Sequence, residues 1–343
     1  MVSRAVQVRD ATPSDSAAIR RVAQASWRET YRDIFASDFI EGFLDEHYGV
    51  EPLERAARVA VERETSAFLV AERRGRVVAY LQFGDGPRGP ELFRIYAHPD
   101  AFGTGAGTAL LDELHRRIDG RVGAYVLDVH SRNVRGRAFY DRHGFVIIGG
   151  GATEDCDLTL RRTLHPAHAP IPIETDRLRL RALEATDSEA AALHRIYGDA
   201  ETMRYVGGRG APSDNAGQTR RALEWFVRHQ QLHGFSLWAM DERDGDSLVG
   251  VAGLLWVEGH GPEVEVAYVL RRDRWGRGYA TEAARAALDV GLGPLGHERI
   301  VALSYPENVA SQRVMAKVGM RPDGTATAYG REMVRYATLA AAP

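Results

Sequence analysis

Two glycine-rich turns, each placed directly before a long helical pattern, recur in the two halves of this chain. The first spans residues 103–107 (GTGAG) and the second spans residues 275–280 (WGRGYA). Beyond the first turn, apolar residues recur at helical spacing: Leu110, Leu111, Leu114 and Ile118. A long helix is also expected from about Thr281 onwards. The repetition predicts that one domain type is built twice along the chain.

The region between the halves is predicted to be a linker. Residues 165–172 (HPAHAPIP) cluster prolines and interrupt the periodic pattern. Residues 6–9 and 178–181 each open a half as a short strand that is followed by a polar turn and a helix. The length of 343 residues suits two domains of about 150 to 170 residues. We therefore predict an N-terminal domain over 1–164, a linker over 165–172 and a C-terminal domain over 173–343.

The predicted elements follow the same order in both halves. In the first half, helices are expected over 15–30, 38–46 and 133–142, a hairpin over 68–71 and 77–83, strands over 91–97 and 122–129, and two final strands. In the second half, we expect a strand pair across 241–247, strands over 264–270 and 299–303, and a helix over 308–317. This order indicates the α/β (α+β) class, with a mixed, largely antiparallel sheet flanked by helices in each half.

Composition argues against several classes of protein. The formal charge of −3 and the dispersed arginines leave no basic tract for nucleic acid. No segment approaches the roughly 18 apolar residues of a membrane helix, and the charged residues after Met1 lack a secretory pattern, so we expect a cytoplasmic protein without a membrane partner. Cys156 is the single cysteine, which excludes an internal disulfide and a multi-cysteine metal site.

The glycine turns suit an anionic ligand. A helix N-terminus presents unpaired N–H groups and partial positive charge, so it can receive phosphate without lysine. Glycine also permits a close backbone approach. Neither turn carries the Gly-Lys-Ser/Thr of a P-loop, and the first lacks the third glycine of a dinucleotide fingerprint. A cofactor with a pyrophosphate, held by backbone amides, is the favoured ligand.

The turns resemble the central motif of the GNAT superfamily of N-acetyltransferases, Gln/Arg-x-x-Gly-x-Gly/Ala, which grips the pyrophosphate of acetyl-CoA. Residues 102–107 (FGTGAG) match it, except that Phe102 replaces the polar first residue. The resemblance covers nearly the whole chain, twice, and implies acetyl-CoA as co-substrate. The binding residues that it implies are Gly103, Gly105, Ala106, Gly107 and Thr108 in the first half and Gly276, Arg277, Gly278, Ala280 and Thr281 in the second.

The second half resembles one branch of the superfamily, the ribosomal-protein N-terminal acetyltransferases of the RimJ/RimL type. Residues 175–181 (TDRLRLR), 275–282 (WGRGYATE) and 306–311 (PENVAS) carry this likeness. In that branch an aromatic residue commonly stands where this chain has Trp275.

The resemblance also implies which group protonates the departing CoA thiolate. Residues 133–145 (NVRGRAFYDRHGF) are similar to the family segment in which an asparagine, here Asn133, contacts the pantetheine arm and a tyrosine, here Tyr140, donates the proton. Core packing is the alternative role of Tyr140. In the second half Met315 stands at the corresponding position and cannot donate a proton. There Asn308 is expected to contact the arm and Ser311 is the candidate acid, with helix capping or packing as its alternative.

An amine acceptor arrives as ammonium, so a carboxylate is expected nearby to take its proton. Glu91 and Glu265 lie on the strand before each glycine turn, where the family often places its base; a solvated strand face is their alternative role. Aromatic residues are candidates for lining the acceptor clefts, with core packing as the alternative: Trp27 and Tyr31 in the first half, Trp225 and Trp238 in the second. The scattered histidines predict no metal site.

The predicted function is acetyl-CoA-dependent transfer of an acetyl group to a primary amine by direct attack, in two tandem domains. The acceptor is expected to be a small molecule or a protein N-terminus, and the chain a monomer or homodimer. In the alternative, one domain is catalytic and the other is an acyl-CoA-binding regulatory or structural domain. A duplicated fold that binds another nucleotide is the third option, which is disfavoured because the match extends beyond the turns.

Overall fold

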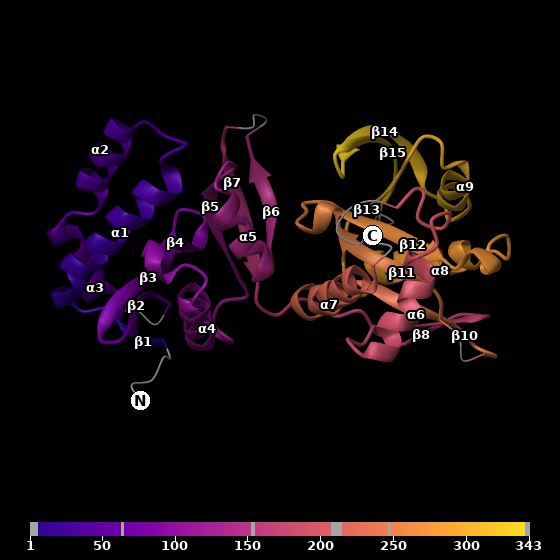
Figure 1. Cartoon of the computed structure of the whole chain (residues 1–343), viewed down its shortest axis with the longest axis horizontal. Coiled ribbons are helices and arrows are strands. Elements are labelled where there is room, and N and C mark those ends of the chain that lie inside the picture. Colours follow the sequence, from indigo (N-terminus) through magenta and orange to yellow (C-terminus); the bar gives the residue numbers. More distant parts are fainter. Residues whose placement is uncertain (1–5, 63–64, 152–154, 207–214, 246–247, 340–343) are drawn as a thin grey trace. The chain divides into compact units, whose positions relative to one another are not determined.

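The computed structural model of the chain divides into two compact units, Met1–His165 and Pro166–Pro343, drawn in Figure 1. It describes residues 6–62, 65–151, 155–206, 215–245 and 248–339. Part of the predicted linker packs on the second unit, because Ala169 is buried and its N–H donates to the carbonyl of Gly234 at 2.8 Å.

The first unit is built on a seven-stranded sheet in the order β1-β2-β3-β4-β5-β7-β6. Its strands are β1 (Gln7–Asp10), β2 (Ala67–Arg73), β3 (Arg76–Gly86), β4 (Gly89–Ala97), β5 (Ala124–His130), β6 (Phe145–Gly150) and β7 (Asp157–Thr163). Its helices are α1 (Ser16–Tyr31), α2 (Ser37–His47), α3 (Val50–Glu62), α4 (Ala106–Ile118) and α5 (Val134–Arg142).

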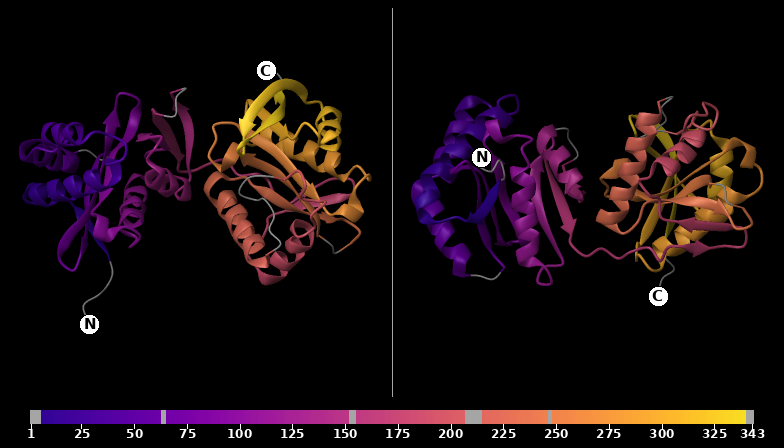
Figure 2. Two further views of the ribbon diagram at one scale, coloured as in Figure 1. Left: turned by 45° about the horizontal axis from the view of Figure 1, so that its top comes forward. Right: turned by 60° about the horizontal axis from the view of Figure 1, so that its bottom comes forward.

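Alternate residues of β2 place the helices on opposite faces of this sheet. Phe68 and Val70 pack in the cluster that contains α1, α2 and α3, whereas Leu69 packs in the cluster that contains α4. Figure 2 shows the indigo helices α1 to α3 gathered on one side of the sheet. Helix α3 was not predicted. Pro52 reads as a break in the pattern, but it lies in the first turn of α3, where proline is tolerated.

The second unit repeats this architecture on an eight-stranded sheet in the order β14-β15-β13-β12-β11-β10-β9-β8. Its strands are β8 (Ile173–Glu174), β9 (Leu178–Arg181), β10 (Leu237–Glu242), β11 (Leu248–Trp256), β12 (Val264–Leu270), β13 (Arg299–Ser304), β14 (Arg321–Ala328) and β15 (Arg331–Leu339). Its helices are α6 (Asp187–Tyr197), α7 (Ala216–His233), α8 (Tyr279–Leu292) and α9 (Val309–Lys317). Helices α8 and α9 share one core cluster, and α6 and α7 share the other.

The α/β class and the largely antiparallel sheets that the element order predicts are confirmed. Helix α7 and the hairpin of β14 and β15 were not predicted. Strand β14 contains Pro322 and Gly324 and exposes most of its residues, so it lacks an apolar alternation. In the predicted strand pair across 241–247, residues 246–247 lie outside the described residues.

Each sheet contains one pair of neighbouring parallel strands, and in both sheets a single residue pair joins the two strands. Strands β4 and β5 pair at Glu91 and Val126, and strands β12 and β13 pair at Glu265 and Val301. All residues of these four strands are described, and no further residue pair joins β4 to β5 or β12 to β13. The two predicted bases therefore occupy equivalent places, each at the point where two parallel strands come together.

Candidate active site

Both glycine turns have the backbone geometry that an anion site needs. Gly105 and Gly278 are the N-cap residues of α4 and α8, with φ of 86° and 82°. Gly103 and Gly276 also have positive φ, of 72° and 75°. A glycine cap has no side chain that could bind the first N–H groups of the helix, so these groups remain available to a ligand. A Cβ added at Gly103, Gly105 or Gly276 would meet nothing within 4 Å, which shows open space beside the turns.

A network that the sequence analysis missed holds the second turn in place. The carboxylate of Glu282, in the first turn of α8, accepts hydrogen bonds from the Thr175 hydroxyl at 2.6 Å and from the backbone N–H of Arg177 at 2.9 Å. The Arg177 guanidinium binds the same carboxylate at 2.7 Å and donates to the carbonyl of Arg277 at 2.8 Å. The segments 175–181 and 275–282 therefore meet through Glu282. Both segments carried the family resemblance, but no pattern in the sequence indicated this contact.

One cavity of 520 Å³ in the second unit brings most of the predicted residues of that half together. The predicted catalytic and cofactor-binding residues that line it are Glu265, Gly276, Gly278, Ala280, Thr281, Asn308 and Ser311. Arg277 is absent from this lining, and its carbonyl is held by Arg177. A helix N-terminus suited to phosphate and a carboxylate suited to an amine thus open into the same space.

Glu265 has the properties of a general base. Its side chain is 6 % exposed, and burial raises its pKa to about 7, with the nearby Glu258 carboxylate acting in the same direction. The hydroxyl of Tyr329, from the turn between β14 and β15, donates to Glu265 Oε1. Tyr329 is fixed in turn by its N–H, which donates to Glu258 Oε1 at 2.7 Å. A carboxylate with a pKa near neutral pH can accept a proton from an amine and release it again.

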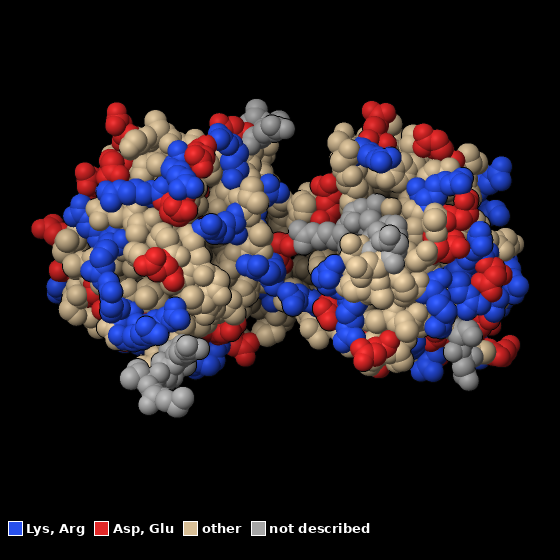
Figure 3. Space-filling view, viewed as in Figure 1, with Lys and Arg blue, Asp and Glu red and all other residues tan. Residues whose placement is uncertain are grey.

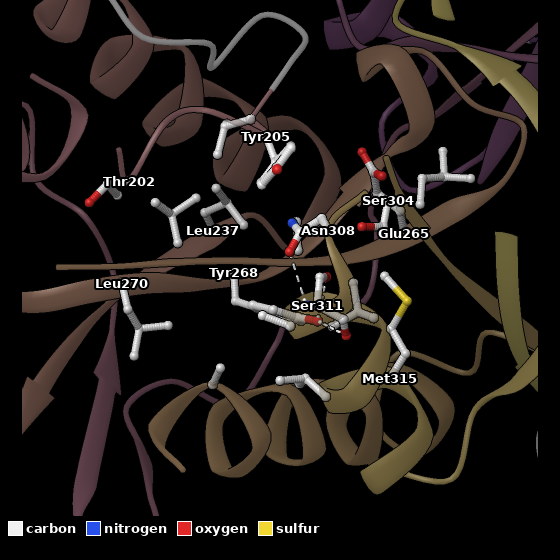
Figure 4. A pocket seen from close by; sticks show the side chains of 18 of the residues that line it. Thr202, Tyr205, Leu237, Glu265, Tyr268, Leu270, Ser304, Asn308, Ser311 and Met315 are labelled. Atoms are coloured by element: carbon white, nitrogen blue, oxygen red, sulfur yellow. Dashed lines mark hydrogen bonds between the residues drawn. The ribbon is translucent and has the colours of Figure 1, made fainter. Parts of the chain in front are cut away.

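The start of α9 carries the other predicted groups, which Figure 4 shows around the cavity. Asn308 caps the helix, because its Oδ1 accepts the N–H of Ser311 at 3.1 Å, and its amide nitrogen remains as a donor. The Ser311 hydroxyl lies 2.9 Å from the hydroxyl of Tyr268 on β12. Met315 is 2 % exposed and packs in the core. Tyr268, which the sequence analysis did not single out, thus stands beside the candidate acid.

In the first unit, Asn133 and Tyr140 lie on α5 beside the first glycine turn. Asn133 caps α5 through its Oδ1, which accepts the N–H of Gly136 at 2.8 Å. Tyr140 is half-buried against Phe145, with the ring centroids 5.2 Å apart. Burial raises the pKa of the Tyr140 phenol above its usual value, so the hydroxyl keeps its proton at neutral pH, as a proton donor must. Core packing and proton donation are compatible for this side chain.

Close packing links α5 to the first turn of α4. A Cβ at Gly107 would lie 3.1 Å from the Phe139 ring, which explains a small residue there. The hydroxyl of Thr108 lies 3.2 Å from His143 Nε2, while Ala106 is buried beneath the turn. The guanidinium of Arg135 lies 4.2 Å from the centroid of the Phe102 ring. Phe102 therefore has a cationic neighbour at the place where the family motif has a polar residue.

A cavity of 490 Å³ in the first unit is lined by Glu91 but not by the glycine turn or Tyr140. Glu91 is buried, and its Oε1 lies 2.6 Å from Arg88 Nε. The other guanidinium nitrogens of Arg88 bind both oxygens of Asp128, at 3.0 and 2.8 Å. Arg88 thus occupies one of the two carboxylate oxygens of Glu91, Oε1.

Some of the aromatic candidates line a cavity, and others are buried in the core. Trp27 lines the cavity of the first unit, and its indole nitrogen is buried without a hydrogen-bond partner among the described residues. Tyr31 is buried beside it, 4.3 Å away between ring centroids. Trp225 lines the cavity of the second unit. Trp238 is a core residue, because it is fully buried and its indole donates to Gln230 at 3.0 Å.

The described residues also bear on metal binding, membrane insertion and surface charge. Within them, no three side chains of the metal-binding types gather into a possible ion site. None of the helices in the described ranges has the length and apolar character needed to cross a membrane. Figure 3 shows basic and acidic side chains intermingled over the visible face of each unit.

Comparison with known proteins places this site in a family. Residues 27–145 match the model described as "Acetyltransferase (GNAT) family", and residues 177–321 match the one described as "Acetyltransferase (GNAT) domain". The uncharacterized protein YkkB of Bacillus subtilis is 32 % identical over 49 % of this chain and 96 % of its own length. The uncharacterized N-acetyltransferase YoaA of the same organism is 30 % identical over 46 % of this chain and 86 % of its own length.

Among solved structures, the chain is similar to the PaiA N-acetyltransferase from Thermoplasma acidophilum in complex with coenzyme A, with 23 % identity, a TM-score of 0.43, and coverage of 46 % of this chain and 99 % of the other. The RimJ/RimL resemblance of the second half stays a prediction. The two matched domains, the relatives and the repeated architecture together show that this chain belongs to the GNAT acetyltransferase family, with two GNAT domains in tandem.

Proposed function

We propose that the second unit transfers an acetyl group from acetyl-CoA to a primary amine by direct attack. The observation that carries this proposal is the single cavity that joins the glycine turn at Gly276 and Gly278 to the buried carboxylate of Glu265. The turn suits the pyrophosphate, and the carboxylate suits the ammonium group of an acceptor. The thioester supplies the activated acyl group.

The residues around the cavity then have separate roles. Glu265 takes the proton that the ammonium must lose before attack, and its pKa of about 7 matches that task. Backbone N–H groups at the turn hold the pyrophosphate, with Thr281 and Ala280 beside them. The amide nitrogen of Asn308 reaches toward the pantetheine arm. Ser311 supplies the proton that the departing thiolate needs.

For the first unit we propose the same reaction, with Gly103, Gly105 and Gly107 around the pyrophosphate and Tyr140 as the proton donor. Glu91 is its proposed base. The ion pair with Arg88 at 2.6 Å supports the alternative for this unit, which is acyl-CoA binding without turnover. An acceptor that uses Glu91 Oε1 must first displace Arg88, whose Nε lies 2.6 Å from that oxygen.

Titration calorimetry of the full chain with acetyl-CoA tests the proposal. Gly105→Glu and Gly278→Glu each place a carboxylate where one pyrophosphate is expected to bind, so each variant should abolish one site. Matched controls are Gly120→Glu and Gly324→Glu, which add the same charge at exposed glycines of positive φ in the same units. The controls reproduce the backbone strain of a side chain in the left-handed region.

We expect two sites per chain, each lost with its own variant and kept in its control. One site that disappears with Gly278→Glu alone would restrict cofactor binding to the second unit. Two sites, with turnover that disappears in Gly278→Glu alone, would make the first unit the regulatory domain. No binding of acetyl-CoA at all would refute the proposed function.

A further inference from the structure

Each unit has a tyrosine in the core layer beside its glycine turn, but the tyrosine lies on a helix in the first unit and on a strand in the second. Ile95 and Tyr268 each stand eight residues before the first glycine of the turn. Tyr140 and Met315 each stand seven residues after the asparagine that caps α5 or α9. In the first unit the strand residue is isoleucine and the helix residue is tyrosine. In the second unit the strand residue is tyrosine and the helix residue is methionine.

These positions belong to the same layer in both units. Ile95 and Tyr140 pack against the core cluster that contains α4. Tyr268 and Met315 pack in the cluster that contains α8. At this pair of positions each unit therefore has one phenol, which comes from a helix in the first unit and from a strand in the second.

The hydroxyl of Tyr268 is directed at the group already proposed as the acid. It lies 2.9 Å from Ser311 Oγ and donates to the backbone oxygen of Ser311 at 3.2 Å. Both side chains line the cavity with Asn308, as Figure 4 shows. Burial raises the pKa of Tyr268 to about 12, so the phenol is protonated at neutral pH.

We propose that Tyr268 and Ser311 form a proton-donating pair that replaces, in the second unit, the phenol of Tyr140. This inference rests on the proposed function of that unit. A serine hydroxyl alone is a poor acid, whereas a phenol is a stronger one and can return a proton to serine. The contact between Tyr268 and Ser311 thus explains how the unit works with methionine in place of the helix tyrosine.

The protons balance as follows. As the C–N bond forms and the C–S bond breaks, Ser311 gives its Oγ proton to the sulfur of the departing thiolate. Tyr268 then gives its phenolic proton to Ser311 Oγ. Glu265 takes the first proton from the ammonium before attack and passes it to solvent in the open cavity, and it takes the second proton from the nitrogen as the C–N bond forms. After product release, Tyr268 regains a proton from solvent and Glu265 gives up its second one. Two protons thus leave at Glu265 and one enters at Tyr268, so the conversion of ammonium and thioester into amide and thiol releases one proton overall.

The test uses the full chain with Gly105→Glu, so that only the second unit binds CoA. Tyr268→Phe removes the phenol and Ser311→Ala removes the serine hydroxyl. Tyr336→Phe is the matched control, because Tyr336 is a half-buried tyrosine that packs on the same core but does not line the cavity. Circular dichroism melts verify folding of every variant.

The first readout is steady-state kinetics. We expect kcat to fall on the order of 10²-fold or more in Tyr268→Phe and in Ser311→Ala, with KM for acetyl-CoA within about twofold of the parent. Tyr336→Phe should leave both constants unchanged.

The second readout needs no turnover. The thiolate absorbance of bound CoA is titrated with pH, and the same titration with desulfo-CoA is subtracted to remove tyrosine ionisation. Hydroxyl groups that donate to the sulfur stabilise the thiolate, so Tyr268→Phe and Ser311→Ala should move the thiol titration about one pH unit upward. A purely structural role of Tyr268 would not move it.

The outcomes separate this inference from the proposed function. If the parent binds no CoA, the proposed function itself fails. If CoA binds normally while turnover and the thiol titration stay unchanged in Tyr268→Phe, the pair has no role. If Tyr268→Phe binds CoA more weakly but leaves the thiol titration unchanged, Tyr268 has only a packing role and the inference is overturned. An effect in Tyr268→Phe without one in Ser311→Ala would overturn the pair in favour of the phenol alone. If Tyr268→Phe fails to fold, the titration of Ser311→Ala decides the matter.

Discussion

Replacing Glu265 by glutamine should remove both a catalytic base and a pH-dependent cost to folding. The buried carboxyl has a pKa of about 7 in the folded second unit, against an ordinary value of 4.5. A general base with this pKa is active when ionised, so kcat/KM of the second unit should rise with pH up to about 7 and then level off. Glu265→Gln should lower kcat/KM on the order of 10²-fold or more and abolish this inflection.

The raised pKa of Glu265 should make the second unit less stable as the pH rises. A carboxylate with a lowered pKa, which is the more usual case, has the opposite effect. Because the pKa is raised in the folded state, the folded protein holds the proton more tightly than the unfolded chain does. The resulting stabilisation is complete below pH 4.5 and is lost as the pH rises to about 7. At 1.36 kcal/mol per pKa unit, the shift corresponds to a loss on the order of 3 kcal/mol, which the glutamine variant should not suffer.

Urea unfolding at a series of pH values measures this difference. Four of the five tryptophans lie in the second unit, so tryptophan fluorescence reports mainly on that unit. The comparison of Glu265→Gln with the parent removes the contributions of all other carboxylates, and Glu298→Gln serves as an exposed control. Equal losses of stability in variant and parent between pH 5 and 8, or an inflection near pH 7 that survives in the variant, would refute the reasoning.

Three further changes test other parts of the structure. Tyr140→Phe, in a chain with Gly278→Glu, should lower kcat on the order of 10²-fold and leave acetyl-CoA affinity unchanged by calorimetry; unchanged turnover would remove Tyr140 from the mechanism. Glu282→Ala removes the acceptor of the Arg177 backbone N–H and one acceptor each of the Thr175 hydroxyl and the Arg177 guanidinium, so the second unit should lose about 2 kcal/mol of unfolding free energy and bind acetyl-CoA more weakly, with the first site unaffected. Trp238→Ala should cost about 3 to 5 kcal/mol and split the thermal melt into two transitions, because only the core of the second unit is damaged. A melt that shifts as one transition would show that the two units unfold together.

The residue pattern was sufficient for the architecture because the signals for it are local. Helical spacing after Gly105 and Gly278, the strand at Val264–Leu270 and the helix capped by Asn308 all depend on neighbours within a few residues. The glycines themselves predict a helix start with positive φ. Helix α3 and strand β14 were not predicted. Both contain a proline, which reads as a break in the pattern, and β14 is mostly exposed, so it also lacks the apolar alternation that would indicate a strand.

The properties of the site came from contacts across long stretches of chain. Glu265 is bound by Tyr329, which lies 64 residues away, and Tyr268 meets Ser311 across 43 residues. Glu282 reaches Thr175 across 107 residues. Sheet register and helix packing decide such contacts. Both units bury the strand glutamate, but Glu91 lies beside Arg88 whereas Glu265 lies beside Tyr329. By itself, the sequence determined two glycine-capped helices and the family that they indicate. Tertiary structure alone decided which of the two buried carboxylates has an arginine partner and which hydroxyl lies beside Ser311, because burial and charge depend on neighbours in space.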